Sequence, residues 1–319
     1  MQDVLSNLIK KADVDYIDIR IEKTDSNSIS FSGDKLDNIS KNHGIGGSVR
    51  VLHKGKWTFN SFNNINNLQE KVNDTIYQAK LLAGNDKSML APVEPVQKVV
   101  RPKIIKDIRN ISISDKKNLL EYFNHKMLFA APEVQTTKVS YTDSYKTIYY
   151  ANSEGTFLDI EKMDAKGSFV VITRKGDLVQ QGSVSWGTND DYGVLERLED
   201  KVDAAVTRAL SQLKAKPIKG GKYTVILDPV LAGVFIHEAF GHLSEADFLY
   251  ENPKMKEIFT IGKRFGPDFL NVVDSGIFPN QRGTYEYDDE GVPAKKTYLI
   301  QNGILTGRLH SRETAAKMG

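Results

Sequence analysis

The chain has 319 residues, of which 40% are hydrophobic and 26% charged, a composition typical of a soluble globular protein long enough for two domains. Its 43 basic residues are balanced by 41 acidic ones, so the formal net charge is only +2. This balance excludes functions that depend on bulk charge, such as non-specific attachment to nucleic acid or to an anionic membrane. The chain has no cysteine, so none of its own side chains can supply a thiolate to a metal.

Residues 1–90 are predicted to form an N-terminal α+β domain. "DVLSNLIKKA" has the spacing of a short amphipathic helix, and "DYIDIRIEKT" and "SISFSGDKLDNISKN" alternate apolar and polar residues as half-buried strands do. "GIGGSVRVLHKGKWTFNSF" predicts a hairpin that turns at "HKGK", followed by a helix that stops at Gly84. Residues 91–113 have little periodicity and are predicted to be a linker or crossing segment.

Residues 114–319 predict a second, larger α+β domain. It would open with a helix capped by Ser114, followed by strands rich in Val, Thr, Tyr and Ile and by a long helix over residues 193–214. "KYTVILD" predicts a short buried strand, and "LNVVDSG" predicts another. The fold class is therefore α+β, an N-terminal α/β unit followed by a larger mixed sheet-and-helix domain.

The last segment predicts a hairpin in "KTYLIQNGILTGRLH", where Asn302 and Gly303 favour a type I′ turn. A single capped helical turn would then end the chain at Gly319. A hairpin and one turn are a poor terminus for so large a domain, so we expect the domain to be incomplete and the chain to be a fragment of a longer protein.

The stretch "FIHEAFGHLSEADF", residues 235–248, contains a candidate metal motif. Pro229 is suited to the first turn of a helix that continues into this stretch. His237 and His242 are five residues apart, which places them about 140° apart on an ideal helix, on different faces. Gly241 tolerates a local bulge, and a single π-type turn would return both rings to one side.

With such a turn, the motif suits a hydrolytic zinc site. His237 and His242 would bind Zn2+ as neutral imidazoles, and Glu238 would activate a metal-bound water for attack on a peptide carbonyl. Another interpretation is a buried helix whose histidines are hydrogen-bonded and structural. A metalloenzyme of another class, such as an iron oxygenase, is a third; it normally takes its ligands from a β-barrel rather than from a helix.

Several segments together resemble the TldD/PmbA family of zinc peptidases. They are "HEAFGHLSEAD" preceded by "VILDPVLAGVFI", the later "GTYEYDDEGVPAKKTYLIQNGILTGRLHSR", and the N-terminal "GIGGSVRVLHKGKWTFNSF". The resemblance implies a cytoplasmic metallopeptidase that acts as a dimer, with itself or with a family relative, on extended peptides or unfolded small proteins. It gives His237 and His242 as metal ligands and Glu238 as general base, and it gives Glu245 and Asp247 as acidic positions that support the histidines.

The third metal ligand is open. Metal-binding members of the resembled family are similar in taking a cysteine from a C-terminal domain, and this chain has none. Either the ligand lies beyond Gly319, or a carboxylate such as Glu245 or Asp247 replaces it, because catalytic zinc sites normally use three protein ligands. A non-catalytic peptide-binding or partner subunit of a TldD/PmbA-type complex is the alternative function.

The acidic cluster "YDDEG", residues 287–291, lacks the alternating ligand spacing of a calcium loop. A solvated turn is the prediction there. The first residues lack a secretory signal, and the most apolar region contains charged residues, so we expect neither export nor a membrane span.

Overall fold

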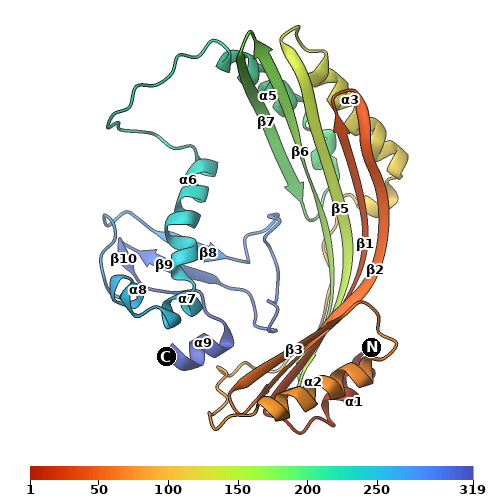
Figure 1. Ribbon diagram of the computed structural model, residues 1–319, viewed down its shortest axis with the longest axis vertical. Helices are drawn as coiled ribbons and strands as arrows, with labels where there is room; N and C mark the ends of the chain where they lie inside the picture. Colours follow the sequence, from red (N-terminus) through yellow and green to blue (C-terminus); the bar gives the residue numbers. More distant parts are fainter. Residues whose placement is uncertain (319) are drawn as a thin grey trace.

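The computed structural model describes residues 1–318; Gly319, where the sequence predicts the last helix to end, lies outside them. A long curved sheet dominates the molecule (Figure 1). Its strand order is β3-β2-β1-β5-β6, and both β4 and β7 pair with β6 on the side away from β5, β4 along residues 157–160 and β7 along residues 165–175. The strands are β1 (Tyr16–Ser32), β2 (Lys35–His53), β3 (Lys56–Phe62), β4 (Gln97–Val100), β5 (Val134–Asn152), β6 (Phe157–Lys175) and β7 (Leu178–Thr188).

The antiparallel pairing of β1 with β5 joins the two predicted domains in one sheet. The crossing segment contributes β4, which pairs in parallel with β6, and a 3-10 turn, η1 (Ile108–Asn110). The mixed helix-and-sheet content confirms the α+β class. The domain boundaries remain a prediction.

Alternation along the strands separates an apolar outer face from a polar concave face. Ile19 and Ile29 of β1 are buried in the cores that the helices cover, whereas Arg20 and Glu22 face the other way. The outer face is covered near one end by α1 (Gln2–Ile9) and α2 (Leu68–Leu82), and near the other by α3 (Ile113–Leu128), α4 (Gly193–Glu196) and α5 (Glu199–Gln212).

The remaining residues, 229–318, are called here the motif-bearing unit, which lies on the concave side of the sheet (Figure 1). Phe240, Phe259 and Phe265 pack edge-to-face or stacked at its centre, with ring centroids 5.3 to 5.8 Å apart. Its elements are α6 (Pro229–Ile236), the π turn η2 (His237–Gly241), the 3-10 turn η3 (His242–Ser244), α7 (Ala246–Glu251), α8 (Pro253–Ile258), β8 (Val272–Ser275), β9 (Lys296–Gln301), β10 (Ile304–Leu305) and α9 (Arg312–Met318).

Both predicted tight turns are confirmed. The β2–β3 hairpin turns at Lys54 and Gly55, and the β9–β10 hairpin at Asn302 and Gly303. All four residues have positive φ, as type I′ turns require. A Cβ on Gly303 would lie 2.1 Å from the carbonyl oxygen of Gly266, so only glycine fits there.

Three predicted elements differ from the structure. The cap of α3 is Ser112, whose hydroxyl accepts from the backbone N–H of Asp115, and Ser114 lies inside the helix. The predicted helix over 193–214 is interrupted at Arg197, which pairs back to Asp191 at 2.6 Å, before the buried Leu198. The final helix, α9, is seven residues long rather than one turn.

The predicted buried strand over residues 222–228 is wrong. The segment has no regular structure, and Ile226 is fully exposed. A strand needs a neighbour to accept its backbone hydrogen bonds, and nothing within residues 1–318 pairs with this one. In the same range, no helix is both long and apolar enough to cross a membrane.

Candidate metal centre

The motif helix begins at a well-formed cap. The Asp228 carboxylate accepts hydrogen bonds from the backbone N–H groups of Val230 and Leu231, at 2.9 and 3.0 Å, and Pro229 occupies the first turn. Pro229 alone was predicted to start the helix, whereas Asp228 and Pro229 together form the complete start signal. This cap fixes where the helix starts, and so which residues reach the π turn.

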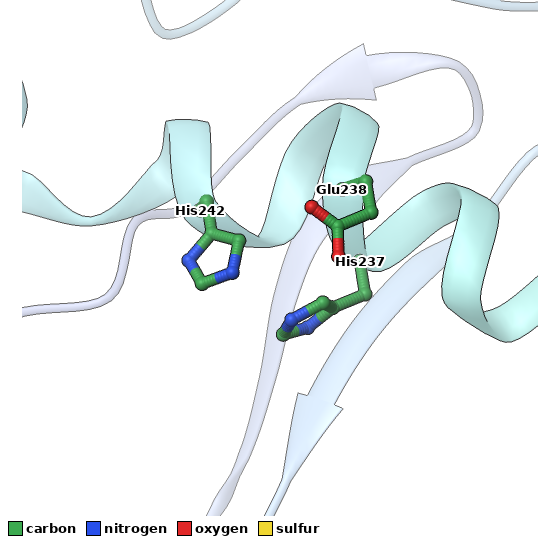
Figure 2. A group of neighbouring side chains, drawn as sticks. All are labelled: His237, Glu238 and His242. Atoms are coloured by element: carbon green, nitrogen blue, oxygen red, sulfur yellow. The ribbon is translucent and has the colours of Figure 1, made fainter.

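The π turn brings the two histidines together. His237–Gly241 is a π-helical segment, and the N–H of His242 bonds to the carbonyl of His237. The two imidazole centroids are 4.5 Å apart with planes at 66° (Figure 2). The bulge predicted from the five-residue spacing is confirmed. A Cβ on Gly241 would lie 3.3 Å from Nδ1 of His237, so the small residue also leaves room for that ring.

The donor atoms fit a metal ion. His237, Glu238 and His242 each offer one ligand atom, and the three lie within 4.8 Å of one another. Ligands bound to zinc at about 2.0–2.1 Å must lie within roughly 4 Å of each other, which small side-chain rotations would achieve here. All three residues are exposed, which argues against the interpretation as buried structural histidines.

Glu245 orients one of the imidazoles. Its Oε1 lies 2.9 Å from Nδ1 of His242, the arrangement in which a carboxylate holds a metal-binding histidine with Nε2 free. The backbone of Glu245 bridges in parallel to Leu309, so its position is tied to the segment before α9. Asp247 is exposed in the first turn of α7 and lies outside the group of three donors.

Packing beneath the motif fixes its orientation. Ile236, Phe240 and Leu243 contact the core of the motif-bearing unit. These residues occupy the inward side of the turn, which leaves the histidines outward. The apolar residues before the π turn are not covered within residues 1–318: Val230, Leu231, Val234 and Phe235 are all more than half exposed.

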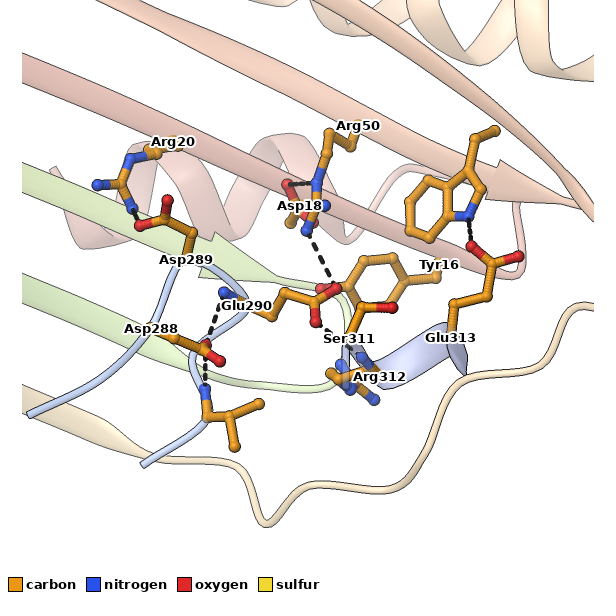
Figure 3. Close-up of polar contacts among 12 residues, drawn as sticks. Tyr16, Asp18, Arg20, Arg50, Asp288, Asp289, Glu290, Ser311, Arg312 and Glu313 are labelled. Atoms are coloured by element: carbon orange, nitrogen blue, oxygen red, sulfur yellow. Dashed lines mark hydrogen bonds and ion pairs between the residues drawn. The ribbon is translucent and has the colours of Figure 1, made fainter. Parts of the chain in front are cut away.

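A polar network ties α9 and the preceding loop to the sheet (Figure 3). Arg312 is 4% exposed, and its guanidinium lies 2.7 Å from the Glu154 carboxylate. The Arg312 backbone N–H donates to Glu290, whose other carboxylate oxygen lies 3.8 Å from Arg50. Arg50 in turn donates to the buried Asp18 at 2.7 Å.

The prediction of a solvated turn at residues 287–291 is wrong for Glu290. The side chain of Glu290 is only 17% exposed and sits inside this network, whereas Asp289 beside it is 85% exposed and pairs with Arg20. Asp288 closes the loop by accepting from the N–H groups of Glu290 and Val292. Glu290 is therefore an anchor of the loop, whereas Asp289 faces solvent as predicted.

We expect Arg312→Met to lower the free energy of unfolding by about 2 kcal/mol, because it removes the hydrogen bonds of the buried guanidinium to the Glu154 carboxylate and to the Ala91 carbonyl. Urea denaturation of the variant measures this loss. Lys317→Met is the matched control in the same helix, since it removes a half-exposed pair with Glu313. An equal loss in the two variants would show that the network does not anchor α9.

Comparison with known protein families identifies three matching segments. Residues 17–81 match PmbA/TldA metallopeptidase domain 1, residues 106–213 match the central domain, and residues 220–319 match the C-terminal domain.

Individual relatives and solved structures are similar to the chain over nearly its whole length. A metalloprotease of Synechocystis is 43% identical over 310 residues, covering 97% of this chain and 67% of the relative. A zinc metalloprotease TldD homolog of Saccharolobus solfataricus is 29% identical, covering 98% and 69%. TldE from Thermococcus kodakarensis shares the fold with a TM-score of 0.77 at 17% identity, covering 100% and 71%. The chain thus spans about two thirds of the length of these proteins.

Proposed function

The chain belongs to the PmbA/TldD family of metallopeptidases, and from this premise we propose that it is a zinc-dependent peptidase acting on unfolded peptides or small proteins. The observation that carries the proposal is the π turn, which gathers His237, Glu238 and His242 within 4.8 Å. The name of the Saccharolobus relative supports zinc as the metal. The cytoplasm is the location that we propose for it.

In this proposal His237 and His242 hold the metal, with Glu245 fixing the second imidazole through Nδ1. The metal supplies Lewis acidity and lowers the pKa of water. Glu238 accepts the proton of the attacking water and returns it to the leaving amine, the usual role of a carboxylate next to such a pair. Its exposed position beside His237 leaves the carboxylate accessible to substrate (Figure 2).

The proposed site needs a third protein ligand. Glu245 is engaged with His242, and Asp247 lies outside the donor group, so neither carboxylate is placed to complete the site without rearrangement. We propose that a residue outside this sequence supplies it, in keeping with the greater length of the relatives. A dimer, either with itself or with a family relative such as a TldE-like protein, is part of the same proposal.

Metal content tests the proposal directly. In the full-length protein, we expect about one zinc per chain, and we expect His237→Ala and His242→Ala each to lose most of it, since removing one of three ligands leaves too few. Inductively coupled plasma mass spectrometry after gel filtration measures the stoichiometry. His43→Ala is the matched control, because His43 is an exposed histidine paired with Asp25 on the sheet.

Zinc retained by both variants would contradict the ligand assignment. A full-length protein that binds peptides but holds no metal dependent on His237 would instead support the non-catalytic partner subunit.

A further inference from the structure

A groove of about 800 Å3 lies where the motif-bearing unit meets the concave face of the sheet. Strands β5 and β6 form its floor, and the loop over residues 279–287, between β8 and β9, forms one wall. Six cationic side chains and four carboxylates line it, so its net charge is positive. The six are Arg101, Lys103, Lys146, Lys162, Lys166 and Arg282.

The floor of this groove carries an unfavourable arrangement of charge. Lys146 on β5 stands directly opposite Lys162 on β6, and like charges at opposite positions destabilise a sheet. Lys146 has partial compensation, because its Nζ lies 3.5 Å from the Glu22 carboxylate. Among residues 1–318, no carboxylate lies within 4.0 Å of the Lys162 ammonium.

The surroundings of Lys162 further destabilise its charged form. The residue is half-buried, and its Nζ is 5.9 Å from the centre of the Tyr285 ring on the opposite wall. Burial, followed by the repulsion of Arg20, lowers the pKa of Lys162, even though Asp289 and Glu22 act in the opposite direction. The charged form is thus destabilised as it stands, and an anion placed next to it would relieve this.

The groove is preformed rather than dependent on a mobile wall. Arg282 donates to both oxygens of Asp164 on β6, at 2.7 and 3.0 Å. The Asn189 amide also donates to the backbone carbonyl of Gln281. Arg101 is occupied by Asp159 at 2.9 Å and Arg282 by Asp164. Lys103 and Lys166 are exposed, so the two opposed, half-buried lysines on the floor are the cations best placed to receive a ligand inside the groove.

We propose that this groove is a subsite for a carboxylate of the peptide substrate, bound between Lys162 and Lys146 under the ring of Tyr285. The proposal rests on the proposed peptidase function and adds a preference to it. The loop that forms the wall lies between β8 and β9 and is part of the motif-bearing unit, so a peptide held here is held against the unit that carries the metal motif. Both the C-terminal carboxylate of a peptide and an acidic side chain have the required chemistry.

Peptide binding to the full-length protein tests this without any need for cleavage. Glu238→Gln is the background, so that the peptide is not cut, and an N-terminally labelled peptide is titrated by fluorescence anisotropy. Four versions of one sequence are compared: with a free or amidated C-terminus, and with an internal Glu or Gln. The amidated arm and the Gln arm separate the two sources of carboxylate.

We expect the carboxylate-bearing peptides to bind more tightly than the neutral one. Lys162→Met should weaken the binding of the carboxylate-bearing peptides about tenfold, because it removes a charged hydrogen-bond partner, and should leave the binding of the neutral peptide unchanged. Lys162→Arg should keep most of the preference. Lys138→Met is the matched control, since Lys138 lies on β5, the strand of Lys146, and on the same face of the sheet but outside the groove.

Each other outcome is decisive. Tight binding that does not depend on the carboxylate, or an equal loss for the neutral peptide in Lys162→Met, overturns the subsite and leaves the peptidase proposal intact. Failure of every peptide to bind overturns both proposals. A carboxylate preference that depends on Lys162 in a protein that holds no metal supports the subsite while the peptidase proposal fails.

Discussion

Glu238→Gln is expected to slow peptide hydrolysis by about a thousandfold while the protein keeps its zinc, because a positioned general base contributes about 10²–10⁴ in rate. Glutamine has nearly the same shape but cannot accept the proton of the attacking water. The effect should fall on kcat rather than on KM, since the side chain acts on the proton and not on the peptide backbone. Steady-state cleavage of a fluorogenic unfolded peptide by the full-length protein measures both constants.

The specificity of this result depends on its controls. Glu257→Gln changes an exposed carboxylate on α8 that is not among the three metal donors, and should leave kcat unchanged. Metal content measured on the same preparations separates loss of the base from loss of zinc. A Glu238→Gln protein that retains zinc and cleaves at the wild-type rate would remove Glu238 from the mechanism, and another group would have to activate the water.

The metal motif was predictable from sequence because its geometry is local. The five-residue interval between His237 and His242 has few solutions on a helix, and Gly241 points to the one that the structure adopts. Periodicity served equally well for the long strands and for α2, where one face is buried against a neighbour. The hairpin turn at "HKGK" and the type I′ turn at Asn302-Gly303 were also predictable, because turn geometry is set by the local residues.

Features that depend on distant partners were not predictable. A short apolar run predicts a buried strand whatever surrounds it in the fold, but residues 222–228 have no strand to pair with within residues 1–318. Glu290 reads as part of a solvated turn, yet Arg50 and Arg312, far away in the chain, enclose it. The opposition of Lys146 and Lys162 depends on the register between β5 and β6, which no local pattern specifies.

The buried ion pair of Lys116 and Asp143 also depends on partners that are distant in the chain, and its removal is expected to lower the stability of the protein strongly. Lys116 on α3 lies 2.7 Å from Asp143 on β5, and both side chains are only 2% exposed. Asn27 and Tyr141 also donate hydrogen bonds to the Asp143 carboxylate. From sequence, Asp143 lies in a strand of alternating apolar and polar residues, where a carboxylate is expected to face solvent. Its partner Lys116 on the preceding helix is not recognisable from sequence, so the burial of the pair was not predicted.

We expect Lys116→Met to lower the free energy of unfolding by about 3–5 kcal/mol, because it leaves an uncompensated carboxylate in the core. Asp143→Asn should cost a similar amount by leaving the ammonium unpaired. The double variant buries no charge, so its loss should be smaller than the sum of the two by about 1–3 kcal/mol. Urea denaturation of all four proteins gives this coupling energy.

Lys117→Met is the matched control on the same helix, one residue away. Lys117 pairs with Glu121 at 2.7 Å, but both side chains are about one third exposed, and such surface pairs contribute about 0.5 kcal/mol. Additive losses in the double variant would mean that water or another group compensates each charge separately. A cooperative loss would show that the pair fixes α3 on the outer face of β5, opposite the face that carries the two lysines of the groove.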